Sequence, residues 1–150
     1  MLELAIEQHS DLSIDTRELQ SNETSYTINT LRSLRKEYPD YALYLIMGAD
    51  AFVYFDAWKE WQDIINYAHI VIANRPDHQI TPGNTLKDWL QKMADKPCQE
   101  GALYGKLYEI QTEMLAISST EIRNQLAQDI QPDALPANVL DYIHSNKLYT

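Results

Sequence analysis

The chain has 150 residues, the length of one ordinary domain, and we expect a single domain over residues 1–150. Its 45% hydrophobic and 23% charged residues, with only 4 Gly and 6 Pro, exclude collagen-like and low-complexity proteins. A net charge of −10 argues against nucleic acid and acidic membrane surfaces as partners.

Helical and strand patterns alternate through the first half of the chain. An amphipathic helix is expected to be capped by Thr24 or Ser25 and to end before Pro39, which cannot continue it. The first helix has no residue that could cap it, so we expect the chain to begin inside an element. The predicted elements are a helix at 2–9, a short exposed strand at 12–19, a helix at 24–38 and a buried strand at 41–48.

The second half continues the alternation and decides the fold class. The predicted elements are a helix at 61–68, a buried strand at 69–73, a helix through 86–93, strands at 107–110 and 114–117, a helix at 118–128 and a last helix around 139–143. Strands that alternate with helices indicate an α/β fold, a Rossmann-like doubly wound parallel sheet with helices on both faces. Such sheets bind ligands at the carboxyl ends of their strands.

The segment ISSTEIR (117–123) stands where a strand passes into a helix. Free backbone N–H groups at a helix start, the hydroxyls of Ser118, Ser119 and Thr120, and the guanidinium of Arg123 together have the donors of a phosphate site. The alternative is a capping box in which Ser118 only caps the helix and Arg123 is solvated, and the pattern alone leaves both open.

Three further positions follow predicted strands. Asp50, after Gly48, offers a carboxylate for ribose hydroxyls or for a metal through water, or it caps the next turn. Trp58 lies off the apolar stripe of its helix, so it either stacks on a planar heterocycle or packs over a loop. Arg75 is a cation at the end of a strand in an acidic chain, and it could equally pair with a surface carboxylate.

The sequence lacks the motifs that several common types of active site require. There is no Walker loop, no G-x-S-x-G and no G-x-G-x-x-G. The four His and Cys98 show no metal-ligand spacing, so structural roles are expected for them and no metal-binding residue is assigned. A single Cys and no apolar run of 18 residues indicate a cytoplasmic protein.

The chain resembles bacterial nicotinate-nucleotide adenylyltransferases along nearly its whole length. ISSTEIR is shared with other adenylyltransferases of the superfamily, whereas the SYT segment and the spacing from GAD to Trp58 narrow the match to the nicotinate enzyme. The segments that carry the resemblance are SYTINTL (25–31), LIMGADAF (45–52), AHIVIANRP (68–76), ISSTEIR and VLDYIHSNKLY (139–149).

The resemblance implies an enzyme that transfers AMP from ATP to nicotinate mononucleotide with Mg²⁺, giving deamido-NAD and pyrophosphate in NAD biosynthesis. Carried over by position, the residues that would contact the mononucleotide and the riboses are Thr27, Gly48, Asp50, Trp58 and the backbone N–H of Lys59. Those that would contact ATP are Arg75, Ser118, Ser119, Thr120 and Arg123, with Arg123 also catalytic.

One family motif has no counterpart in this sequence. The family's first strand and Gly-rich loop carry G-G-[ST]-F-D-P-x-H-x-G-H, whose histidines hold the ATP phosphates, and no such segment occurs here. We therefore expect an N-terminally truncated nucleotidyltransferase domain without its central strand, whose activity alone is in doubt. The alternatives are a nicotinamide-mononucleotide or pantetheine-phosphate adenylyltransferase, or a non-catalytic binding remnant. A homo-oligomer is compatible with the sequence.

Overall fold

The computed structural model describes residues 1–74, 81–94, 100–112, 118–128 and 130–149. The chain divides into two compact units. One unit consists of Met1–Thr16 and Leu115–Thr150, and the other of Arg17–Met114. Within the described residues, no helix is both long enough and apolar enough to span a bilayer.

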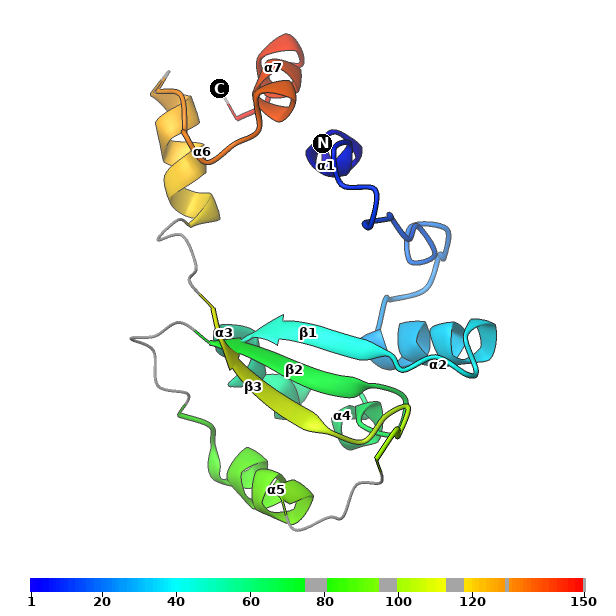
Figure 1. Cartoon of the computed structure of the whole chain (residues 1–150). Coiled ribbons are helices and arrows are strands. Elements are labelled where there is room, and N and C mark those ends of the chain that lie inside the picture. Colours follow the sequence, from blue (N-terminus) through cyan, green and yellow to red (C-terminus); the bar gives the residue numbers. More distant parts are fainter. Residues whose placement is uncertain (75–80, 95–99, 113–117, 129, 150) are drawn as a thin grey trace. The chain divides into compact units, whose positions relative to one another are not determined.

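In the part of the chain that the structure describes, the Arg17–Met114 unit is built on a parallel sheet of three strands in the order β1-β2-β3 (Figure 1). The strands are β1 (Tyr44–Gly48), β2 (His69–Asn74) and β3 (Leu107–Gln111). Tyr44 lies opposite His69, and Ile70 lies opposite Leu107, so all three carboxyl ends meet at one edge of the sheet. The central strand β2 is almost fully buried, which explains its unbroken apolar sequence.

One face of the sheet carries the main hydrophobic core. Side chains alternate between the two faces of a strand, and Met47, Ile70 and Ile72 share the face that packs against the helices. The opposite face includes Ile46, whose side chain is 67% exposed. The elements that supply the core are α2 (Thr27–Glu37), α3 (Ala49–Phe52), the 3-10 helix η1 (Phe55–Ala57), α4 (Trp61–Ile64) and α5 (Asn84–Ala94).

Two side chains fasten the amino ends of the strands. His69 accepts a hydrogen bond at Nδ1 from the Lys106 N–H (3.1 Å), so its Nε2 carries the proton and donates to the Ala102 carbonyl (2.9 Å). The Arg35 guanidinium donates to loop carbonyls from three segments of the chain, those of Tyr38, Pro39, Tyr41, Tyr67 and Leu103. Both groups thereby fix the end of the sheet opposite to the carboxyl edge.

The described residues of the other unit form the helices α1 (Leu2–Ile6), α6 (Ser119–Ala127) and α7 (Ala137–Ser145). Its core is formed by Leu126, Val139 and Ile143. The Asn138 Nδ2 group donates to the Leu4 carbonyl (2.7 Å), which joins α7 to α1. These contacts explain how segments from the two ends of the chain form one unit.

The structure confirms the parallel α/β fold and most of the predicted elements, but it corrects four of them. The strand expected at 12–19 is irregular chain and turn, and the first helix ends at Ile6. Tyr26 precedes α2 without a side-chain cap, so neither Thr24 nor Ser25 caps it. The helix at 61–68 ends at Ile64, because the chain then turns into β2. The strand expected at 114–117 lies outside the described residues.

Candidate functional site

The first turn of α2 lies against the segment that follows η1. Thr27 is the first residue of α2, and the Lys59 ammonium stands 4.4 Å from the ring centroid of the preceding Tyr26. A cation over an aromatic face is attracted by the ring quadrupole. This contact brings Thr27 to the same part of the molecule as Trp58 and Lys59, three positions that the family resemblance assigns to the mononucleotide.

Trp58 is half-buried at the border of the core. Its ring packs edge-on against Phe55, with centroids 5.5 Å apart. Phe55 in turn contacts Trp61 (5.8 Å) and Trp89 (6.0 Å), so an aromatic cluster supports one side of Trp58. The two readings of Trp58 from the sequence are therefore compatible, because the indole contacts the core and keeps part of its surface exposed.

An ion pair between Arg32 and Glu60 joins α2 to the segment that follows Trp58. Arg32 on α2 donates to Glu60 (Nη2 to Oε2, 2.5 Å) and to the Tyr67 hydroxyl (3.3 Å). The hydrogen bond from Arg32 lowers the pKa of the Glu60 carboxyl, and the same bond raises the pKa of Arg32. Glu60 also has a left-handed backbone conformation, with φ of 49°, in the turn between Trp58 and α4.

Gly48 and Asp50 stand together at the carboxyl end of β1. Asp50 lies inside the first turn of α3, where its Oδ1 accepts the Ala51 N–H (3.0 Å), and Gly48 rather than Asp50 precedes the helix. A Cβ at position 48 would lie 2.5 Å from Asp50 Oδ1. The glycine therefore makes room for this carboxylate, which is exposed at the carboxyl edge of the sheet.

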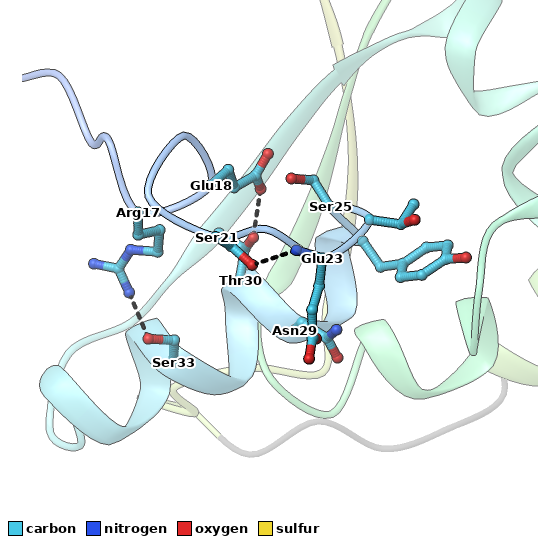
Figure 2. A pocket seen from close by; sticks show the side chains of 10 residues that line it. Arg17, Glu18, Ser21, Glu23, Ser25, Asn29, Thr30 and Ser33 are labelled. Atoms are coloured by element: carbon cyan, nitrogen blue, oxygen red, sulfur yellow. Dashed lines mark hydrogen bonds between the residues drawn. The ribbon is translucent and has the colours of Figure 1, made fainter.

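A cavity of about 180 Å³ lies between the 17–26 segment and α2 (Figure 2). Its polar side chains pair largely with one another. The Arg17 guanidinium donates to Ser33 (3.0 Å) and to Glu37 (2.8 Å), and the Thr30 hydroxyl donates to Glu18. These bonds hold the 17–26 segment on α2 and set the approach of the chain to Thr27, so we assign the cavity a structural role.

The start of α6 is organised as a capped helix. The Ser118 hydroxyl accepts the Glu121 N–H (3.1 Å), which is the cap that the sequence left open as the alternative to a phosphate site. Arg123 folds back along the helix, where Nε donates to the Ser119 carbonyl (2.9 Å) and Nη2 to the Ser119 hydroxyl (3.1 Å). Thr120 and Arg123 are exposed, so the first turn of α6 displays hydroxyls and a guanidinium to solvent. The structure thus brings Ser118, Ser119 and Arg123 together.

Asn74, the last residue of β2, is a buried polar residue to which sequence reasoning gave no role. Its side chain is 7% exposed, and Nδ2 donates to Glu109 Oε1 (3.2 Å). Within the described chain its Oδ1 has no hydrogen-bond partner. The only sequence signal was a polar residue at the end of a buried strand. Arg75, which follows it, lies outside the described residues, and its contact with ATP stays a prediction.

Comparison with known proteins identifies the family. The family model described as Cytidylyltransferase-like matches residues 1–125, which defines the class. The Probable nicotinate-nucleotide adenylyltransferase of Psychromonas ingrahamii is 41% identical over 99% of this chain and 71% of its own length. The protein of the same description from Pseudoalteromonas atlantica is also 41% identical, over 69% of its length. The chain belongs to the nicotinate-nucleotide adenylyltransferase family of enzymes.

A solved structure agrees in fold. The nicotinic acid mononucleotide adenylyltransferase of Plasmodium falciparum, in a complex with NaAD, superposes with a TM-score of 0.63. The match covers 96% of this chain and 69% of that one at 22% identity. It supports the Rossmann-like α/β fold.

Proposed function

We propose that this chain takes part in adenylyl transfer from ATP to nicotinate mononucleotide, giving deamido-NAD and pyrophosphate. The observation that carries the proposal is the arrangement of Thr27, Trp58 and Lys59 around the first turn of α2, in a chain of this family. In the reaction, a phosphate oxygen of the mononucleotide attacks the α-phosphorus of ATP. The bond from that phosphorus to the β-phosphate oxygen breaks, and pyrophosphate leaves.

Recognition of the mononucleotide rests on an aromatic face and nearby donors. The indole of Trp58, supported by Phe55, offers a surface on which the pyridine ring stacks. The backbone N–H of Lys59 donates to the ring carboxylate, and the ammonium of the same residue adds positive charge beside it. An amide in place of the carboxylate gains less from this charge, which favours the acid form of the mononucleotide.

We assign recognition of the ATP phosphates to the first turn of α6. The N–H groups and hydroxyls of Ser118, Ser119 and Thr120 hold phosphate oxygens at the helix N-terminus. Arg123 stabilises the charge that develops on the phosphates during transfer. The Asp50 carboxylate, beside Gly48, accepts from ribose hydroxyls.

A magnesium ion is part of the proposed reaction through its complex with ATP. Among the described residues no three His, Cys, Asp or Glu side chains come together as a metal site. Mg²⁺ commonly binds through one or two carboxylates, waters and substrate phosphates, and exposed Asp50 fits such a water-mediated contact. When bound, the ion neutralises phosphate charge, while the residues of this chain position the nucleotides.

Binding of the reaction product tests the proposal directly, because deamido-NAD contains both the nicotinate mononucleotide and the AMP part of ATP. The 150-residue chain is titrated with deamido-NAD by calorimetry, and the titration is repeated in the presence of ATP or of nicotinate mononucleotide. We expect saturable binding that each of the two substrates weakens. Binding that neither substrate affects, or no binding, would contradict the proposal.

A further inference from the structure

Asn74 ends the central strand of the sheet with an unused acceptor. Its backbone is fixed, because its carbonyl accepts the Thr112 N–H (3.0 Å) and lies 3.4 Å from the Thr112 hydroxyl. Its side-chain amide donates to Glu109, so the whole residue is held in place between β2 and β3. Only Oδ1 lacks a partner among the described residues, and this atom is buried.

The orientation of the amide follows from its neighbour. The Glu109 carboxylate, when ionised, can only accept hydrogen bonds, so the amide must present its Nδ2 to it and turn Oδ1 away. A buried acceptor without a donor is unfavourable, because it has lost its hydrogen bonds to water and gained none in return. Native proteins rarely keep such a group unless water or a ligand satisfies it.

The position of Asn74 in the sheet indicates which kind of ligand could donate a hydrogen bond to Oδ1. It lies at the carboxyl edge of the sheet, where parallel α/β sheets bind their ligands, and the preceding Ala73 is opposite Gly48 in the register. Phosphate oxygens are acceptors and cannot satisfy Oδ1. The groups of ATP that can donate are the 6-amino group of adenine and the ribose hydroxyls.

We propose that Asn74 Oδ1 accepts a hydrogen bond from the nucleoside part of ATP, from its 6-amino group or from a ribose hydroxyl. Asn74 is then a specificity-determining residue, and Glu109 is a positioning residue that holds its amide. The inference rests on the proposed function, and it adds a contact that the family resemblance does not assign.

The test compares ATP with analogues that each lack one donor. The 150-residue chain, its Asn74→Leu variant and its Asn74→Ala variant are titrated by calorimetry with ATP, purine riboside triphosphate, 2′-deoxy-ATP and 3′-deoxy-ATP. Purine riboside triphosphate lacks the 6-amino group. Leucine resembles asparagine in size and has no polar atom, and alanine serves if leucine does not fit. Gln111→Ala is the matched control, because Gln111 lies opposite Asn74 in the register and is exposed.

In the unsubstituted chain, we expect one analogue to bind about tenfold more weakly than ATP, the loss typical of one hydrogen bond. Asn74→Leu should weaken ATP by about the same factor and should leave that analogue unchanged. Gln111→Ala should bind all four nucleotides as the unsubstituted chain does. The analogue whose affinity does not change on Asn74→Leu lacks the group that donates to Asn74, so it identifies the donor as the amino group or as one of the hydroxyls.

Two results would overturn the inference and leave the proposed function intact. One is ATP binding that Asn74→Leu and Asn74→Ala do not change. The other is an equal loss for ATP and for every analogue, which would mean that Asn74 only supports the sheet. Absence of ATP binding by the unsubstituted chain would contradict the proposed function as well, so the two failures are distinguishable.

Discussion

Trp58 is both a packing residue and a candidate ligand contact. One side of its indole meets Phe55, and the half-buried state of the residue leaves surface for a pyridine ring. Trp58→Ala should weaken nicotinate mononucleotide by roughly 0.5–1.5 kcal/mol beyond the effect of lost contact area. ATP binding should change much less. Calorimetric titration with each ligand measures both effects, with Trp58→Phe as the control that keeps an aromatic face. Equal losses for the two ligands would remove Trp58 from the mononucleotide site.

Arg123 is exposed and folded onto Ser119, so its guanidinium is held at the first turn of α6. Arg123→Ala should weaken ATP by roughly 1.5–3 kcal/mol, the usual range for a hydrogen bond to a charged group. Arg123→Lys should retain part of this affinity, because an ammonium supplies charge without the planar fork. The dissociation constant for ATP at fixed ionic strength is the measurement. An unchanged constant in Arg123→Ala would leave Arg123 as a solvated residue of the helix surface.

The contrast between Ser118 and Asn74 shows which site residues a sequence can reveal. The cap at Ser118 depends on residues three positions apart, so the motif could offer its bond to Glu121 as one of two alternatives. The roles of Asn74 depend on Glu109 in another strand and on the burial of an oxygen, which no local pattern contains. Chemical roles carried over for the remaining site positions await binding measurements.

At the scale of elements, α4 is stabilised by the aromatic cluster rather than by its length. Trp61 packs against Trp89 with ring centroids 5.4 Å apart, which connects α4 to α5. Trp61 is partly buried against the core, so Trp61→Ala should lower the free energy of unfolding by somewhat less than the roughly 3–5 kcal/mol of a fully buried tryptophan. Urea denaturation followed by circular dichroism measures this change, with Trp61→Phe as the control that keeps an aromatic ring. A loss below about 1 kcal/mol would mean that the cluster is not part of the core.

The bond between Arg32 and Glu60 makes part of the stability depend on pH. Because the bond lowers the pKa of Glu60 below its ordinary value of 4.5, its contribution is complete above that value. The contribution is lost as the pH falls through the lowered pKa of the folded state. The difference in unfolding free energy between the unsubstituted chain and Glu60→Gln should therefore be constant from neutral pH down to about pH 5 and should shrink below it. A difference that does not vary with pH would exclude this ionic contribution.

Elements were predictable where their own residues determine them. The apolar run of β2 and the periodicity of α2 and α5 identified these elements, because burial favours unbroken or periodic apolar residues. The prediction of a strand at 12–19 was wrong, because a strand also needs a neighbouring strand with which to form hydrogen bonds. Its Leu12 is 52% exposed, and no strand forms in this described segment.

At the scale of the whole molecule, charge sets the conditions for substrate binding. The net charge of −10 repels the anionic substrates on average, so binding requires local cations. Lys59 beside Tyr26 and Arg123 on α6 provide such charges in the two units. Under the proposed function, these are the charges that bind phosphates and a carboxylate.

The most direct test of the account is the preference of the chain for nicotinate mononucleotide over nicotinamide mononucleotide, which differ in a carboxylate and an amide. Their dissociation constants are measured by calorimetry on the 150-residue chain under identical buffer and salt. The account predicts that the acid binds about ten- to a hundredfold more tightly, as expected for one charge-assisted hydrogen bond. Equal affinities, or tighter binding of the amide, would contradict the assignment of this chain to nicotinate mononucleotide.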